Sequence, residues 1–262
     1  YDYGSINMYL QQRYKMNGII NTINTACSSS ANAIMYGARL IESGRVKRAI
    51  VGGVDSLAKF TINGFNALHI LSAETCTPFD ENRKGLNLGE GAAFLVLEKE
   101  SDCIGKKNYA TLSGYSNAND AYHASSLSDE GNGPYKAMND ALVKAELTAS
   151  EIDFINAHGT GTENNDRVEG TAILRLFGKA PAFTSTKANT GHTLGAAAAI
   201  EAVYAVLNLY HQELYPGINF KDSISTLGLT PLQSYKKMEI HNIMSNSFGF
   251  GGNCSSLIFS KA

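Results

Sequence analysis

The sequence lacks the features that mark nucleic-acid-binding, disulfide-stabilised and zinc-finger proteins. Its 22 basic and 24 acidic residues give a formal net charge of −2, without the basic excess that attracts phosphate. Its four cysteines, Cys27, Cys76, Cys103 and Cys254, form no Cys-x-x-Cys pair. They therefore indicate neither a disulfide framework nor a zinc finger, and they fit a reducing compartment.

Long apolar runs and a recognisable start are also missing. No stretch approaches the roughly 20 apolar residues that a membrane span requires. The first residues, Tyr1-Asp2-Tyr3-Gly4, have no signal-peptide character and no initiator Met. We therefore expect a cytoplasmic protein without a membrane span. The 262 residues suffice for one large folded unit or two smaller ones.

Cys27 lies where a strand-like segment gives way to a helical one. Residues 18–25 are β-branched and polar, which predicts a strand, and an apolar repeat at helical spacing follows from Ser29 to a stop at Gly44. A helix N-terminus carries partial positive charge, which lowers the pKa of a thiol placed there. Taken alone, the stretch supports two interpretations equally: a nucleophile that is partly thiolate, or a small buried core residue.

Strands and helices alternate along the rest of the chain. A buried strand at 48–54 after the Cys27 helix predicts a parallel βαβ unit. The other predicted strands are 92–97, 109–116, 152–156, 182–186, 242–247 and 255–259, and the other predicted helices are 59–72, 134–147, 166–177 and 194–209. The series of strand, polar turn and buried helix occurs twice, which predicts an internally duplicated α/β fold.

Polar turns after the predicted strands contain His158, Lys187 and His192. Catalytic groups of α/β proteins gather at the carboxyl ends of strands, and a cysteine beside imidazoles suits acyl transfer through a thioester. Zinc is the competing interpretation of Cys27 with the two histidines, but their separation along the chain fits no metal motif, and we predict no metal. Glu201 falls within an apolar helix, where a buried carboxylate needs a partner such as Lys187.

Six motifs resemble those of the β-ketoacyl-acyl carrier protein synthases, the condensing enzymes of fatty acid and polyketide synthesis. In chain order they are Thr25-Ala26-Cys27-Ser28-Ser29, Pro78-Phe79-Asp80 with Gly89-Glu90-Gly91, Asp120-Ala121-Tyr122-His123, His158-Gly159-Thr160-Gly161-Thr162, Ser185-Thr186-Lys187 through Gly191-His192, and Asn246-Ser247-Phe248-Gly249-Phe250-Gly251-Gly252. Together they span essentially the whole chain, and six matches in order are far more specific than any one of them.

The resemblance implies a thiolase-like fold, in which two related α/β halves stack as α-β-α-β-α layers. Residues 1–105 would then be the remainder of the amino-terminal half, with the nucleophile, and residues 106–262 the carboxyl-terminal half, with both histidines. Family members are longer before the nucleophile. We therefore expect the carboxyl-terminal portion of a longer synthase, or a chain that works beside a separate segment, with an open sheet edge and uncovered apolar faces.

The resemblance also implies a reaction, the decarboxylative condensation of a cysteine-bound acyl group with a malonyl thioester on acyl carrier protein. Cys27 would accept the acyl group, and His158 and His192 would donate hydrogen bonds to the malonyl carbonyl. Supporting roles would fall to Lys187, Glu201 and the gate residue Phe250, whose backbone N–H would complete an oxyanion hole with that of Cys27, and to Thr160, Thr162 and Phe248 along the substrate channel. No metal or organic cofactor is implied beyond the phosphopantetheine arm of the carrier.

The family is usually dimeric, so a second subunit, identical or different, is expected as a further partner. Some family pairs include a non-catalytic subunit with a structural or chain-length role, and this is the alternative function. Such subunits lose the cysteine, whereas Cys27 is present here. Two departures point weakly to a specialised pathway: Ala73-Glu74 stands where many relatives have a carrier-docking arginine, and the family's Gly-Gly-Thr-Asn ending is Gly251-Gly252-Asn253-Cys254.

Overall fold

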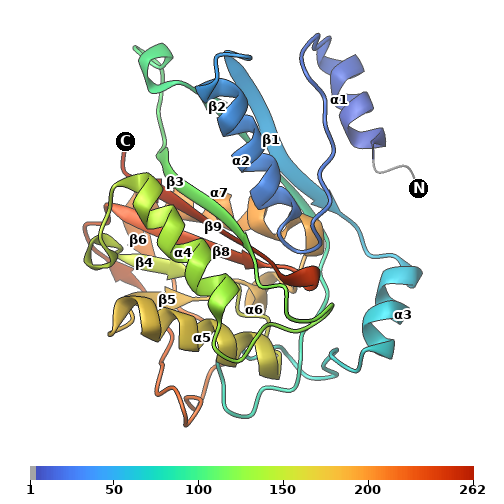
Figure 1. Ribbon diagram of the computed structural model, residues 1–262, viewed down its shortest axis with the longest axis vertical. Coiled ribbons are helices and arrows are strands. Elements are labelled where there is room, and N and C mark those ends of the chain that lie inside the picture. The colour runs from blue at the N-terminus through green and yellow to red at the C-terminus, as the bar shows by residue number, and fades with distance from the viewer. Residues whose placement is uncertain (1–3) are drawn as a thin grey trace.

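The computed structural model describes residues 4–262, which form two principal sheets and a small third one (Figure 1). The strands are β1 (Arg48–Asp55), β2 (Gly91–Glu98), β3 (Thr111–Asn119), β4 (Phe154–Asn156), β5 (Ala182–Thr184), β6 (Glu213–Leu214), β7 (Lys236–Lys237), β8 (Asn242–Phe248) and β9 (Asn253–Ser260). The helices are α1 (Ser5–Tyr14), α2 (Ser29–Glu42), α3 (Lys59–Ala67), α4 (Asn132–Ala145), α5 (Glu163–Phe177), α6 (Lys187–Thr190) and α7 (Ala197–His211), with short 3-10 turns at Glu100–Asp102, Ala149–Glu151, Leu194–Ala196 and Phe250–Gly252.

The larger sheet has five strands in the order β3-β9-β8-β4-β5. Strand β4 runs parallel to both β8 and β5, whereas β9 is antiparallel to its neighbours β3 and β8. The carboxyl ends of β8, β4 and β5 therefore lie together at one edge, where ligands of α/β sheets bind. Strands β1 and β2 form a separate antiparallel pair.

Helices α2 and α7 lie between the two principal sheets. Both contact β1 and β2 on one side and the five-stranded sheet on the other, while α4 covers the opposite face of that sheet and packs against α5. The buried face of α2 consists of Ala31, Ile34, Met35 and Leu40, and α7 contributes small alanines, so the two helices approach each other closely. This packing joins the two sheets into one core.

Two sequence-based predictions about the first half are wrong. Residues 18–24 form no strand, and Thr25 makes only an isolated bridge to Cys27, because no strand among residues 4–262 runs beside this segment to accept its backbone hydrogen bonds. The strand at 48–54 belongs to an antiparallel pair with β2 rather than to a parallel βαβ unit, and Val51 is the one buried residue of β1. The other predicted elements are present within a few residues of their expected bounds.

The described residues stack in four layers, α-β-α-β. The outer face of the β1–β2 pair is exposed, with Phe94 at 42% and Val96 at 62% relative exposure, and no helix of residues 4–262 covers it. This uncovered apolar face agrees with expectation, whereas the fifth, outer helical layer is not among the described residues. The division into units at residues 105 and 106 stays a prediction.

One helical stretch of the described residues, Leu194–His211, is long and apolar enough to cross a membrane by length and composition. Half of it is buried within the fold, where it packs between the two sheets. A core helix passes the same test of length and composition, so its apolar character reflects burial inside the protein.

Candidate active site

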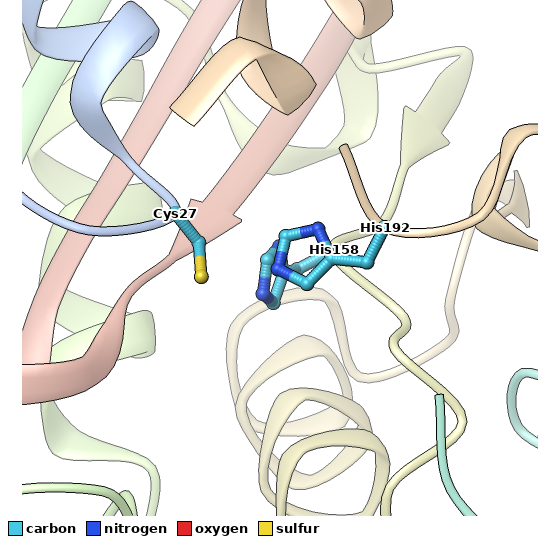
Figure 2. A group of neighbouring side chains, drawn as sticks. All are labelled: Cys27, His158 and His192. Atoms are coloured by element: carbon cyan, nitrogen blue, oxygen red, sulfur yellow. The ribbon is translucent and has the colours of Figure 1, made fainter. Parts of the chain in front are cut away.

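The functional candidates converge at the edge where β8, β4 and β5 end. His158 follows β4 by two residues, Lys187 and His192 follow β5, and Phe248 is the last residue of β8. Cys27 reaches the same place from the other side, at the turn that leads into α2. Figure 2 shows the Cys27 sulfur and the two imidazole rings facing one another. The sulfur and one ring nitrogen from each histidine lie within 4.8 Å of one another.

A strained turn presents Cys27. Ala26 has a φ of 54°, in the left-handed region that alanine rarely adopts, and this reverses the chain directly before the cysteine. Ser29 stabilises the reversal: its hydroxyl donates to the Ala26 carbonyl at 2.6 Å and accepts the Thr25 N–H at 2.9 Å. Strain of this kind persists only where surrounding contacts enforce it, and it gathers at functional sites.

Of the two interpretations of Cys27 from sequence, its surroundings oppose the partly ionised thiol. Burial raises its pKa to about 11, because Cys27 is a buried residue with 6% relative exposure. The nearby Lys187 charge and backbone hydrogen bonds from Phe250 and from Cys27 itself lower the pKa, but by less than burial raises it. Both expected oxyanion-hole donors therefore act on the sulfur, yet the resting cysteine is a thiol.

Both imidazoles are neutral. Burial lowers the pKa of His158 and of His192 well below the ordinary value, and the positive charge of Lys187 lowers it further. The rings meet edge to face, with centroids 5.4 Å apart. A neutral imidazole carries one N–H donor and one acceptor nitrogen, so each ring can donate to a substrate oxygen without bringing a charge.

Different parts of the chain hold the backbone at the two histidines. His192 N–H donates to the Asn87 carbonyl at 2.7 Å, and Gly89 N–H donates to the His192 carbonyl at 3.0 Å. At His158, the buried carboxylate of Glu169 accepts the N–H of His158 at 2.9 Å and that of Gly159 at 2.8 Å. These contacts hold the two imidazoles on independent parts of the chain.

The expected pair of Lys187 and Glu201 is present. Lys187 Nζ lies 2.5 Å from Glu201 Oε1, and the two side chains are only 1% and 3% exposed. Burial raises the pKa of Glu201 while Lys187 lowers it. The Lys187 charge also acts on Cys27, His158 and His192, which makes it the cation common to the site.

A cavity of about 610 Å³ opens onto Cys27 and both histidines. Its wall includes Thr160, Thr162, Phe248 and Phe250, as expected, together with Phe65, Leu68 and His69 from α3 and the residues after it. The hydroxyls of Thr160 and Thr162 lie 2.9 Å apart. The ring of Phe65 stacks on that of Phe250, with centroids 5.8 Å apart, so α3 closes one side of the cavity.

A metal could find ligand atoms in this cavity, since a thiol and two imidazoles are zinc ligands. The charge environment opposes it, because the buried Lys187 already places a positive charge beside all three groups. The arrangement serves a nucleophile with two neutral hydrogen-bond donors better than it serves a divalent cation.

Comparisons with known proteins agree with this geometry. Residues 6–103 match the profile of the β-ketoacyl synthase N-terminal domain, and residues 109–221 match that of the C-terminal domain. The chain belongs to the β-ketoacyl synthase family. It is 36% identical to a mitochondrial 3-oxoacyl-acyl-carrier-protein synthase of Arabidopsis thaliana over 97% of this chain and 59% of that protein, and 38% identical to synthase 2 of Rhizobium meliloti over 95% and 62%.

Solved ketosynthase structures also resemble this chain over its whole length. The ishigamide ketosynthase/chain length factor covers the whole chain with a TM-score of 0.96 at 30% identity, and a ketosynthase of Xenorhabdus doucetiae in complex with its chain length factor does so with 0.93 at 41%. The fold is therefore thiolase-like. The chain spans about 60% of the length of the two curated relatives and about two thirds of these structures.

Sequence reasoning missed Glu169 as a support of the turn that carries His158. Glu169 and Asp166 are completely buried on α5, and Asp166 accepts the N–H of Phe79 at 2.8 Å and that of Gly161. A signal was available: both acids share a helical face with the apolar Ala172 and Ile173, and an acid at a core position needs a partner. The stacking of Phe65 on Phe250 had no comparable signal.

Proposed function

We propose that this chain carries the active site of a decarboxylative condensing enzyme. The reaction joins an acyl group on Cys27 to a malonyl unit on acyl carrier protein and yields a β-ketoacyl product in fatty acid or polyketide synthesis. One observation carries the proposal: a thiol and two neutral imidazoles share one cavity, with a buried cation behind them and two backbone N–H groups at the sulfur.

In the first half-reaction, the Cys27 sulfur attacks the carbonyl of an acyl thioester on the carrier. A new C–S bond forms at Cys27, the bond to the arm breaks, and the thiol proton leaves with the released arm. The developing oxyanion is stabilised by the N–H groups of Cys27 and Phe250, preorganised donors of the kind that contribute most to such catalysis. Because the resting sulfur is a thiol, its proton must depart as attack proceeds, and a neutral imidazole can accept it.

In the second half-reaction, a malonyl thioester enters with its carbonyl toward His158 and His192. Loss of carbon dioxide breaks a C–C bond and leaves an enolate, whose oxygen accepts hydrogen bonds from the two imidazoles. The enolate carbon attacks the Cys27 thioester, a new C–C bond forms, and the C–S bond breaks. The sulfur then recovers a proton. Neutral donors suit this step because they stabilise the enolate without holding the malonate carboxylate in place.

The remaining groups fit the carrier. Thr160 and Thr162 line the cavity, where their hydroxyls suit the amides of a phosphopantetheine arm, and Phe248 and Phe250 narrow it beside Cys27. We infer that the arm is the only cofactor-like group, that the partners are the carrier and a second subunit, identical or not, and that the protein works in the cytoplasm. A solved relative from Xenorhabdus doucetiae is in complex with its chain length factor, which supports a paired subunit.

The test separates the two half-reactions. H158A and H192A are expected to lower condensation about 10²-fold or more, the scale of one lost oxyanion donor, while acyl transfer to Cys27 falls much less. Intact-mass measurement follows acylation of the 262-residue chain by acyl carriers of several lengths, and released carbon dioxide follows decarboxylation. C27A provides the control that cannot be acylated.

Two results would contradict the proposal. Malonyl decarboxylation at the wild-type rate in both histidine variants would remove the proposed role of the imidazoles. A wild-type chain that binds a partner subunit yet never acquires an acyl group would favour the non-catalytic subunit instead.

A further inference from the structure

Asn253 joins three elements around the nucleophile. It is the first residue of β9, and its Oδ1 accepts the Ser28 hydroxyl at 2.6 Å, Asn117 Nδ2 at 2.7 Å and Asn32 Nδ2 at 3.0 Å. Its own Nδ2 donates back to Asn117 Oδ1 at 3.3 Å. Ser28 and Asn32 belong to the start of α2, and Asn117 lies on β3. A carbonyl oxygen with two lone pairs is fully used by such a set of donors.

The contacts of Asn253 reach both turns that face the Cys27 sulfur. On one side is Ser28, which directly follows Cys27 and is completely buried. On the other side, the Asn253 carbonyl accepts the N–H of Gly249 at 2.8 Å, which closes the turn that presents Phe250. The side chain of Asn253 therefore holds the Cys27 turn, and its backbone holds the Phe250 turn.

The two turns also touch directly at Gly249. A Cβ at this position would lie 2.8 Å from the Thr25 carbonyl oxygen and 3.2 Å from the Cys27 nitrogen, so only glycine fits. This contact sets how close the turns can come. The hydrogen bonds of Asn253 are a directional polar link between them, beside the bond from Asn32 Nδ2 to Ser255 Oγ at 3.2 Å.

We propose that Asn253 is a positioning residue for the nucleophile: it fixes the Cys27 turn against the Phe250 turn, so that the N–H groups of Cys27 and Phe250 meet on one acyl oxygen. The proposal rests on the proposed function for its catalytic meaning. Its physical basis is that oxyanion donors are effective only at the right distance and direction, which a supporting shell must enforce.

The test uses the reactivity of Cys27 itself. Burial raises the pKa of the thiol most, and backbone hydrogen bonds from Phe250 and Cys27 lower it. Loss of these hydrogen bonds while the sulfur stays buried therefore raises the pKa and leaves less thiolate at any pH, whereas faster alkylation would show that the cavity had opened instead. In the 262-residue chain, N253A is expected to slow alkylation of Cys27 by iodoacetamide about tenfold across pH 7–10. Peptide mapping assigns the label, and Cys103 in the same sample provides the reference rate.

S260A is the matched control. Ser260 lies at the other end of β9, and its hydroxyl also bridges strands, at 2.7 Å from Ser113 Oγ and 2.6 Å from Asn242 Oδ1. Loss of these bonds is expected to lower the melting temperature about as much as N253A does, with Cys27 alkylation unchanged. An equal slowing in S260A would reduce Asn253 to a general structural role and overturn the proposal.

Ser28→Ala tests the same link from its other end and serves if N253A fails to fold. S28A is expected to slow the alkylation of Cys27 as well. The double variant that combines S28A with N253A is expected to slow it by less than the product of the two single slowing factors, because both substitutions remove one shared contact. Fully multiplicative effects, or wild-type pH profiles in N253A or S28A, would overturn the proposal.

An acylation assay distinguishes this proposal from the proposed function. Single-turnover acyl transfer to Cys27 is expected to fall about tenfold or more in N253A, less than the 10²–10³ that follows complete loss of one donor. If the wild-type chain accepts no acyl group, the proposed function fails, and the alkylation comparison still decides the role of Asn253.

Discussion

At the scale of single residues, burial governs ionisation throughout the cavity. It raises the pKa of the Cys27 thiol and lowers that of both histidines, so the three groups rest in their neutral forms. Lys187 is the charged exception beside them. In the resting state, the site therefore contains three neutral groups near one fixed cation. This arrangement favours negative charge that develops during the reaction over negative charge that is present beforehand.

Cysteine alkylation tests this neutral resting state. Because the pKa of Cys27 is about 11, its alkylation rate is expected to rise with pH up to about pH 10 without a plateau. Cys76 and Cys254 are expected to react more slowly, since both are buried outside the cavity and burial raises the pKa of each above that of Cys27. Rates come from peptide mapping over a pH series, with C27S as the control.

The expected labelling differs from that of a partly ionised Cys27. A thiolate at a helix N-terminus would react well before the other cysteines, whereas with a neutral Cys27 the more exposed Cys103 is expected to label readily too. A rate for Cys27 that levels off near pH 7 would show a resting thiolate and contradict the assignment of a neutral thiol.

The buried pair of Lys187 and Glu201 has separable structural and electrostatic roles. K187A is expected to lower the free energy of unfolding by about 3–5 kcal/mol, because it leaves Glu201 charged and unpaired in the interior. Replacing both residues by apolar ones, Lys187→Met with Glu201→Leu, is expected to restore most of that stability. Denaturant unfolding of the three proteins measures the comparison.

Cys27 reactivity is the second readout for this pair. The Lys187 charge lowers the pKa of Cys27, so the apolar double variant is expected to keep its stability but alkylate more slowly at every pH. If the stable double variant alkylated at the wild-type rate, Lys187 would have only a structural role.

At the scale of elements, the contact of α2 with the segment that begins α7 requires a glycine on the neighbouring strand. A Cβ on Gly53 of β1 would lie 2.7 Å from Ser30 Cβ and 2.8 Å from the Gly195 carbonyl oxygen. G53A is therefore expected to destabilise the fold by about 1–3 kcal/mol through overpacking. Gly64 within α3 has no neighbour within 4 Å, so G64A is expected to stabilise by about 0.5–1 kcal/mol.

Thermal unfolding of both glycine variants measures this contrast. An unchanged melting temperature for G53A would mean that the approach of α2 to α7 can relax without cost. The G64A variant provides the reference for a glycine that is not constrained by packing.

Segments with clear apolar spacing were predictable from the sequence, whereas the partner of a strand was not, as the antiparallel pairing of β1 with β2 shows. Helix α2 follows from the apolar spacing of Ala31, Ile34 and Ala38, and β8 and β9 follow from short apolar runs around a glycine-rich turn. Residues 18–24 have strand-like composition but pair with no strand among residues 4–262, and composition does not reveal whether a partner strand is present.

The candidate site divides in the same way. Cys27, His158, Lys187 and His192 were recognisable because their residue types and turns suggest chemistry. The structure brings Cys27 and both histidines into one cavity and places the Lys187 charge near them. The protonation of Cys27 was not predictable, because it depends on how much water the surrounding fold excludes. Glu169 was missed because its role is to accept backbone N–H groups that lie eleven and ten residues earlier.

At the scale of the whole molecule, the buried titratable groups link stability to pH with opposite signs. The histidines have folded-state pKa values below their unfolded value, so their contribution to stability is present above about pH 6.5 and is lost as the pH falls. Glu169 acts oppositely, because burial raises its pKa to about 7 in the folded protein from 4.5 in the unfolded chain. The native state therefore binds the Glu169 proton more tightly.

Glu169→Gln isolates that carboxyl. Between pH 4.5 and 7 the unfolded chain releases the Glu169 proton while the folded protein keeps it, so wild-type stability falls as the pH rises and is constant again above pH 7. E169Q has no proton to release. Weakened hydrogen bonds to His158 and Gly159 lower the stability of E169Q by an amount that does not depend on pH. From pH 4.5 to 7 the free energy of unfolding of E169Q relative to wild type is expected to rise by up to about 3 kcal/mol.

The measurement is the free energy of unfolding of both proteins in denaturant at a series of pH values, taken as a difference so that other titrating groups cancel. E151Q is the control, because hydrogen bonds from Thr148 lower the pKa of Glu151 below 4.5 and place its linkage at lower pH. A difference between E169Q and wild type that stays constant from pH 4.5 to 7 would mean that the backbone N–H groups of His158 and Gly159 keep Glu169 ionised throughout. In that case the support beneath His158 is a fixed negative charge, and it would partly offset the influence of Lys187 on the imidazole.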